Sequence, residues 1–316
     1  MTLRDAIDHY VAWRRAHGAR FITSAGTLYQ FCKSVPEKVC CDTVTEGEVR
    51  LFLAGSSPLT RWRANKYGAL AGFYRYAISR GYATRSPLPA ADEEPRAPVS
   101  APSYIFSREE LRRLFEAVDI SRRRASRLDG DTFRTLLLIL YGSGLRTSEA
   151  LHLTIRDVDL ADAVLTVRNT KFYKNRLVPV ACQLAIELRA YAERRSNRPL
   201  PEGMETAFLA NRDGTQVKKY NVDYAFRRLL KAAGINRRDD GRRAPCLHAL
   251  RHTAAVHRLT SWYCEGKDLQ RLLPALSTYL GHANLDGTSV YLSMTPELLH
   301  EASIYFDRYV NGGDHA

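Results

Sequence analysis

The sequence predicts a mainly α-helical protein of two domains, the second of which contains a small antiparallel β-sheet. Apolar residues recur every three to four positions through most of the 316 residues, as on the buried face of a helix. Prolines crowd one stretch, and proline at that density blocks both helices and central strands. Two runs of strand-forming residues, 163–168 and 176–180, flank a polar turn. We therefore expect a helical bundle at 1–85, a linker at 86–104, and an α+β domain at 105–316.

Four helical segments are expected in the first domain. The first begins near Leu3, and the others cover 24–33, 45–53 and 60–79. Thr45 and Glu48 form a capping box at the start of the third segment, and Gly81 follows the end of the fourth. The apolar periodic positions of the fourth segment are Trp62, Leu70, Phe73, Tyr74 and Ala77. Four helices in this length make a small bundle.

The fourth segment also carries basic side chains between its aromatic residues, namely Arg61, Arg63, Lys66, Arg75 and Arg80. One interpretation is a helix face that grips the phosphates of a DNA duplex. The other is the ordinary solvated face of an amphipathic helix. This helix alone does not decide between the two.

The second domain is expected to be mostly helical around its small sheet. Its helical segments are expected at 107–118, 131–141, 147–153, 181–195, 220–233, 248–263, 268–276 and 296–309. The segment 131–141 is strongly apolar and ends at Gly142-Ser143-Gly144. Arg122-Arg123-Arg124 falls in an expected loop.

The composition favours a globular protein with a polyanionic partner. Apolar residues make up 45% of the chain, the net charge is +13 and the pI is about 9.6. Nucleic acid and an anionic membrane surface both fit this charge. No apolar run reaches the length of a membrane span, and the first residues lack the apolar core of a secretory signal. The six cysteines lack metal-site spacing, so we expect reduced thiols, no cofactor, no metal and a cytoplasmic protein.

The first two candidate chemical segments each carry a cation at a backbone turn. Arg146 follows the Gly-Ser-Gly break, where it can project from a rigid core, and Glu149 lies one helical turn later, where it can hold the guanidinium. Lys171 lies at the tip of the expected hairpin, with Lys174 and Arg176 beside it. A lysine on such a turn can deliver a proton to a leaving oxygen, although solvated hairpin tips are often rich in lysine.

The other two segments place histidine, arginine and tyrosine near the end of the chain. His248 and Arg251 are three positions apart on one helix, so both can face the same anion. His252 is expected to point elsewhere. Leu280-Gly281-His282 is followed nine positions later by Tyr291. A tyrosine becomes a nucleophile only when neighbouring cations and a proton acceptor activate it.

Taken in order, these segments resemble the tyrosine recombinase (phage integrase) family. The resemblance covers most of the chain and implies a SAM-like core-binding domain at 1–85 and a catalytic domain at 105–316. It implies that the catalytic residues are Arg146, Lys171, His248, Arg251, His282 and Tyr291, supported by Glu149. DNA contacts are expected from the basic residues at 61–75 and from Lys174 and Arg176. The hairpin departs from the family pattern because no glycines flank Lys171, and residues 262–276 make the segment between Arg251 and His282 longer than usual.

The resemblance also implies a reaction and its partners. Tyr291 would attack a DNA phosphate to give a 3′-phosphotyrosyl link, and a 5′-hydroxyl would then reseal the strand without metal or ATP. The expected partners are double-stranded DNA with a specific target site, three further copies of the chain in a tetramer, and accessory proteins. A type IB topoisomerase-like enzyme and a catalytically silent DNA-binding accessory protein are the alternatives.

Overall fold

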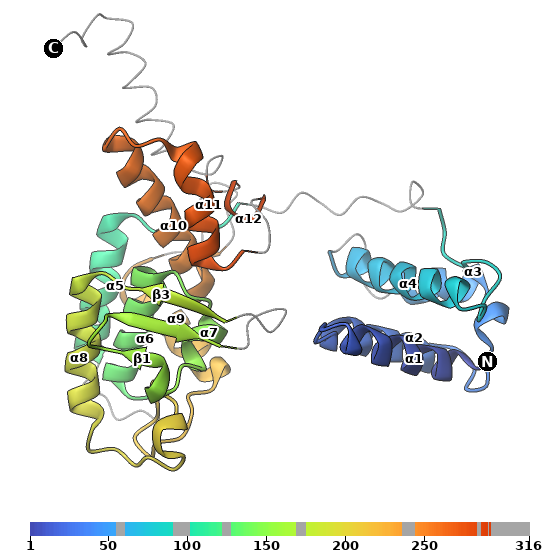
Figure 1. Ribbon diagram of the computed structural model, residues 1–316, viewed down its shortest axis with the longest axis horizontal. Helices are drawn as coiled ribbons and strands as arrows, with labels where there is room; N and C mark the ends of the chain where they lie inside the picture. Colours follow the sequence, from blue (N-terminus) through green and yellow to red (C-terminus); the bar gives the residue numbers. More distant parts are fainter. Residues whose placement is uncertain are drawn as a thin grey trace, which may run out of the picture. The chain divides into compact units, whose positions relative to one another are not determined.

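The computed structural model describes residues 1–54, 61–90, 102–121, 128–168, 175–235, 244–282, 286–289 and 291. The chain divides into two compact units, the first within Met1–Ser100 and the second beginning at Ala101. Helices dominate both units, and the sheet of the described residues has three short antiparallel strands (Figure 1). The predicted fold class is confirmed. The exact domain and linker boundaries stay a prediction.

The first unit is a bundle of four helices. They are α1 (Leu3–Ala16), α2 (Ile22–Ser34), α3 (Glu46–Ala54) and α4 (Arg61–Ser79). Helix α4 packs against the other three and buries Phe73 and Tyr74 in their shared core. The predicted capping box is present, since the Thr45 amide donates to the Glu48 carboxylate over 2.8 Å. Trp62, however, is 47% exposed and lies outside this core, because the bundle covers only the buried stripe of α4.

Helix α6 lies at the centre of the second unit. The helices of this unit are α5 (Arg108–Ser121), α6 (Gly130–Ser143), α7 (Thr147–Leu151), α8 (Cys182–Arg195), α9 (Lys219–Ala232), α10 (Leu247–Cys264), α11 (Leu269–Leu280) and α12 (Asp286–Ser289). Helix α6 contacts α5, α7, α8 and α10, and Leu136, Leu137, Ile139 and Leu140 are buried in these contacts. The loop expected at 122–124 and the helix expected at 296–309 lie outside the described residues.

The sheet consists of β1 (Val158–Asp159), β2 (Val164–Val167) and β3 (Arg176–Pro179), in that order. The two predicted strands are present, and β1 was not predicted because two residues carry no periodic signal. Strand β2 pairs with β3 so that Val167 lies opposite Arg176. This register places Arg176 at the end of β3 that leads to the polar turn.

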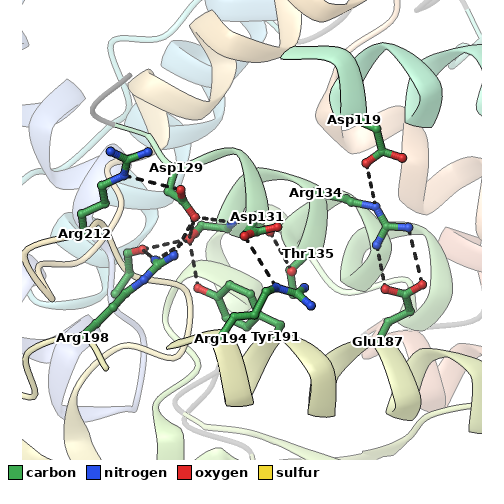
Figure 2. Close-up of polar contacts among 12 residues, drawn as sticks. Asp119, Asp129, Asp131, Arg134, Thr135, Glu187, Tyr191, Arg194, Arg198 and Arg212 are labelled. Carbon is green, nitrogen blue, oxygen red and sulfur yellow. Dashed lines mark hydrogen bonds and ion pairs between the residues drawn. The ribbon is translucent and has the colours of Figure 1, made fainter. Parts of the chain in front are cut away.

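Arginine–carboxylate contacts fix α6 against its surroundings (Figure 2). Arg134 on α6 contacts Glu187 on α8 over 2.7 Å and Asp119 on α5 over 3.1 Å. At the start of the helix, Asp129 caps the backbone of Thr132 and accepts a hydrogen bond of 2.6 Å from Arg198. These contacts hold the apolar helix α6 in one orientation, so the position of its C-terminal end is fixed.

A second, smaller apolar cluster joins α10 to α11. Its members are Ile105, Ala255, Val256, Leu259, Leu276, Leu280 and Tyr291. The Tyr291 ring is only 2% exposed and is therefore held by core packing. The Tyr291 hydroxyl is the only polar side-chain group among these seven residues.

Candidate active site

Arg146 projects from the turn between α6 and α7. Gly144 ends α6 with a positive φ of 63°, and a Cβ there would lie 2.7 Å from the Leu280 side chain. Glycine is thus required for this turn, which makes Arg146 the N-cap residue of α7. Its guanidinium donates to Glu149 over 2.7 Å and to the Gly281 carbonyl over 2.8 Å. The contact with Glu149 expected from the sequence is therefore present.

Glu149 is held by two arginines at once. Besides Arg146, Arg176 donates to both carboxylate oxygens, over 2.8 and 3.1 Å, and also to the Tyr279 carbonyl over 3.2 Å. Burial alone would raise the pKa of Glu149, but the hydrogen bonds from Arg176 and Arg146 outweigh it and lower the pKa to about 2. The Arg176 side chain is largely buried and its donors bind inside the protein, while its expected contact with DNA stays a prediction.

Arg251 is the most deeply buried of these cations. Only 1% of it is exposed, and it donates to the Gly144 carbonyl over 2.6 Å and to the Leu280 carbonyl over 2.8 Å. Both carbonyls lie at the C-terminal ends of helices, where the helix dipole favours a positive charge. Burial lowers the pKa of Arg251 to about 10, and the charge of Arg146 acts in the same direction. The guanidinium therefore stays charged at neutral pH.

Three histidines and Tyr291 lie together beside these arginines. The His248 and His252 rings are edge to face with centroids 4.6 Å apart, and the centroids of His252 and Tyr291 are 5.4 Å apart. Nδ1 of His252 is 3.0 Å from the Tyr291 hydroxyl. The expectation that His252 points elsewhere is wrong. His248, Arg251 and His252 lie at positions i, i+3 and i+4 of α10, and this spacing could have revealed that all three share a face.

His282 approaches Tyr291 from the other side. Its ring centroid is 6.0 Å from that of Tyr291, and its Nδ1 is 2.7 Å from the hydroxyl of the buried Thr288. Gly281 precedes it with a φ of 71°, and a Cβ at Gly281 would lie 2.7 Å from the Arg176 guanidinium. Thr288 was not singled out from the sequence, since a threonine in a short helix carries no signal of its own.

Burial and the arginine charges keep His248 and His282 neutral. Burial lowers the pKa of His248, and the charges of Arg251 and Arg146 lower it further. The same causes lower the pKa of His282 to about 4. Burial raises the pKa of Tyr291, while Arg251 and Arg146 act against that rise. At neutral pH the site therefore holds His248 and His282 as neutral imidazoles, a protonated phenol and fixed guanidinium charges, which suits the binding of an anion.

The remaining predicted site residues are Lys171 and the basic residues expected to bind DNA. Lys171 and Lys174 lie outside the described residues, as does the side chain of Arg61. The expectation that Lys66 belongs to an open basic face is wrong, because it is 9% exposed and donates to the Phe52 carbonyl over 2.8 Å. Arg63 is half-buried and Arg75 is exposed on α4.

The described residues contain neither a candidate metal site nor a helix that could span a membrane. No group of three or more His, Cys, Asp and Glu residues within them could hold a metal ion. No described helix has the length and apolar character needed to cross a membrane. None of the six cysteines forms a disulfide bond in the structure, and only Cys41 is buried.

The sequence profile of the phage integrase family matches residues 105–297, which is more than half of the chain and includes Arg146, His248, Arg251, His282 and Tyr291. The chain belongs to the phage integrase family. It is thus a tyrosine recombinase, an enzyme of site-specific recombination. The comparisons do not favour the topoisomerase or the silent accessory protein.

Relatives of this phage integrase family member match nearly its full length. The Sinorhizobium fredii protein y4rB, whose name classes it as an integrase/recombinase, is 32% identical over 97% of this chain and 98% of its own. Tyrosine recombinase XerC of Chlorobaculum tepidum is 33% identical over 83% of this chain and 78% of its own. The Tn1549 transposon integrase, solved with a circular intermediate DNA, has the same fold, with a TM-score of 0.69 at 17% identity over 98% of this chain and 99% of that chain.

Proposed function

We propose that this recombinase cleaves and rejoins DNA through a 3′-phosphotyrosyl intermediate on Tyr291. The observation that carries the proposal is the position of the Tyr291 hydroxyl, which lies 3.0 Å from Nδ1 of His252. Arg251, Arg146, His248 and His282 belong to the same site. A phosphodiester under attack carries spread negative charge and expels an alkoxide. Fixed cations, neutral imidazoles and a buried phenol are the groups that this chemistry requires.

Each side chain has a distinct role in the proposed cleavage step. The Tyr291 oxygen attacks phosphorus, and the bond from phosphorus to the 5′ oxygen breaks. Arg146 and Arg251 bind the non-bridging oxygens, and His282 donates a hydrogen bond to one of them. Lys171 protonates the leaving 5′ oxygen, and His248 assists this proton transfer. Glu149 and Arg176 do not touch the phosphate in this scheme but fix the orientation of Arg146.

Rejoining reverses these steps with a different strand. A 5′-hydroxyl attacks the phosphotyrosyl link, and Tyr291 leaves as the phenol. Because the link retains the energy of the phosphodiester bond, no ATP is consumed. Guanidinium groups supply the positive charge at phosphorus, so the scheme has no step that requires a metal.

Double-stranded DNA with a specific target site is the proposed partner. The net charge of +13 supports a polyanionic partner, and Arg63 and Arg75 of the first unit add positive charge for phosphate contacts. A lambda integrase tetramer bound to a Holliday junction has a TM-score of 0.63 to this chain at 18% identity, over 90% of this chain and 78% of that one. By analogy we propose that this recombinase acts as a tetramer on DNA. We also propose that it acts in the cytoplasm, in the transposition or integration of a mobile element.

Covalent capture tests this function on a target site whose sequence is still to be identified. The protein is incubated with fragments of DNA that flank its gene, and adducts that survive denaturation are collected and sequenced. We expect the attached peptide to contain phosphorylated Tyr291 and the released strand to carry a 5′-hydroxyl that polynucleotide kinase can label. Attachment at another residue, or a 5′-phosphate on the released strand, would contradict the proposal.

Arg176→Met is expected to slow adduct formation about 10- to 100-fold on the captured site. The substitution removes the two-point contact with Glu149, so Arg146 loses the partner that fixes its orientation. Binding of uncleaved DNA should change little, because Arg176 itself points into the protein. Single-turnover cleavage measures the rate of adduct formation, and gel-shift experiments measure the binding of uncleaved DNA.

Arg134→Met is the matched control for Arg176→Met. It removes another arginine–carboxylate fork of the same unit, to Glu187, which Figure 2 shows among the contacts of α6 and α8. It should lower stability without slowing cleavage below the unfolding temperature. Equal slowing by both variants would show that Arg176 acts only through stability.

A further inference from the structure

The Tyr291 hydroxyl lies beside a histidine that could accept its proton. Nδ1 of His252 lies 3.0 Å from the oxygen. Burial raises the pKa of this phenol, and the charge of the nearby Arg251 guanidinium acts against that rise. Arginine has only donors, so Arg251 cannot take the phenol proton. A neutral His252 with its ring proton on Nε2 offers Nδ1 as an acceptor for that proton.

The fold holds His252 firmly in this position. The residue follows Arg251 on α10, and the flanking side chains of Leu250, Arg251 and Thr253 are all buried. The His248 ring stands edge to face against it, with an angle of 90° between the rings. Tyr291 in turn is fixed by the apolar cluster between α10 and α11. A proton donor and its acceptor are thus aligned by two packed elements, which is the preorganisation that proton transfer needs.

Several other groups near Tyr291 hold hydrogen bonds elsewhere or can only donate. His282 uses its Nδ1 with Thr288. The Glu149 carboxylate is occupied by Arg146 and Arg176, and these two arginines can only donate. His252 is the histidine whose nitrogen is hydrogen-bonded to the phenol in the described part of the chain.

We propose that His252 is a catalytic residue that takes the proton from Tyr291 during cleavage and returns it during rejoining. The inference rests on the proposed function, in which Tyr291 is the nucleophile. As the Tyr291 oxygen bonds to phosphorus, its proton moves to Nδ1 of His252, and the ring becomes an imidazolium. The electron pair of the broken bond stays on the 5′ oxygen, which takes a separate proton from the general acid. In rejoining, the departing Tyr291 oxygen recovers the proton from Nδ1.

His252→Phe tests this role, with His257→Phe as a matched control. His257 lies on the same helix, and its Nδ1 is also 3.0 Å from a tyrosine hydroxyl, that of Tyr141. On a nicked duplex of the captured target site, we expect His252→Phe to slow single-turnover adduct formation about 100-fold or more. His257→Phe should react at close to the wild-type rate. A wild-type rate for His252→Phe would overturn the inference, and thermal melting with gel-shift binding shows whether each variant folds.

Two modified reactants separate proton acceptance from a merely structural role. A substrate with sulfur at the bridging 5′ position releases a thiolate, which needs no proton. This substrate should restore the cleavage rate of a variant that lacks the general acid. Cleavage by His252→Phe should stay slow. Replacing Tyr291 with the more acidic 3-fluorotyrosine should recover part of the rate in His252→Phe. Full rescue by the sulfur substrate, or no recovery with fluorotyrosine, would overturn the role of His252 as the acceptor. If wild type forms no adduct at all, the proposed function fails instead.

Discussion

Tyr291→Phe is expected to form no detectable covalent adduct with the target DNA. The substitution removes a single oxygen, and a ring without a hydroxyl has no nucleophile to offer to phosphorus. The phenylalanine ring should still pack in the cluster between α10 and α11, since that part of the contact is apolar. His252 loses one hydrogen-bond partner, so stability should fall by only about 1–2 kcal/mol. Folding and DNA binding should therefore survive while cleavage disappears.

Tyr279→Phe is the control for this experiment. Tyr279 lies beside the site, its pKa is also raised by burial, and its hydroxyl donates to the Pro179 carbonyl over 3.1 Å. Loss of the Tyr279 hydroxyl removes one hydrogen bond but no group that takes part in cleavage, so adduct formation should continue. Denaturing gels with labelled nicked duplex compare the variants directly. An adduct in Tyr291→Phe, or its loss only in Tyr279→Phe, would move the nucleophile to another residue.

The parts of the site that the sequence predicts well are those set by local geometry. Arg146 and Glu149 are three positions apart after a glycine break, so their contact follows from the helix that begins there. His248 and Arg251 share a helix face for the same reason. The capping box at Thr45 and the two longer strands are equally local. In each case the signal lies within a few residues, where backbone geometry leaves few alternatives.

The missed parts depend on contacts between distant segments. Arg176 is 27 positions from Glu149, and beside Lys174 it was interpreted as one of several surface cations. Lys66 was placed on a basic face by its neighbours, although its ammonium turns inward to the Phe52 carbonyl. From the sequence we expect His252 to point away from the site. Its partner Tyr291 comes from 39 positions away, and helical spacing alone could not locate that hydroxyl.

Arg251→Lys is expected to reduce cleavage about 10²- to 10³-fold, even though it keeps the positive charge. The guanidinium joins three elements, because it binds the last carbonyls of α6 and α11 while it extends from α10. A lysine ammonium is a compact donor without the planar fork, so it cannot reach both carbonyls together. At least one buried carbonyl then loses its partner, which should cost about 1–3 kcal/mol of stability. Single-turnover cleavage and urea unfolding measure the two effects on the same preparation.

Arg258→Lys provides the comparison on the same helix. Arg258 is exposed, with its guanidinium 6.0 Å from the centre of the Trp262 ring, so lysine should replace it at little cost to either property. The loss of cleavage in Arg251→Lys should persist at temperatures where the variant is fully folded, because the missing fork and not unfolding is the cause. If cleavage returns to the wild-type rate once unfolding is suppressed, Arg251 serves only to hold α6, α10 and α11 together. A persistent defect means that the same fork both joins the helices and binds the reacting phosphate.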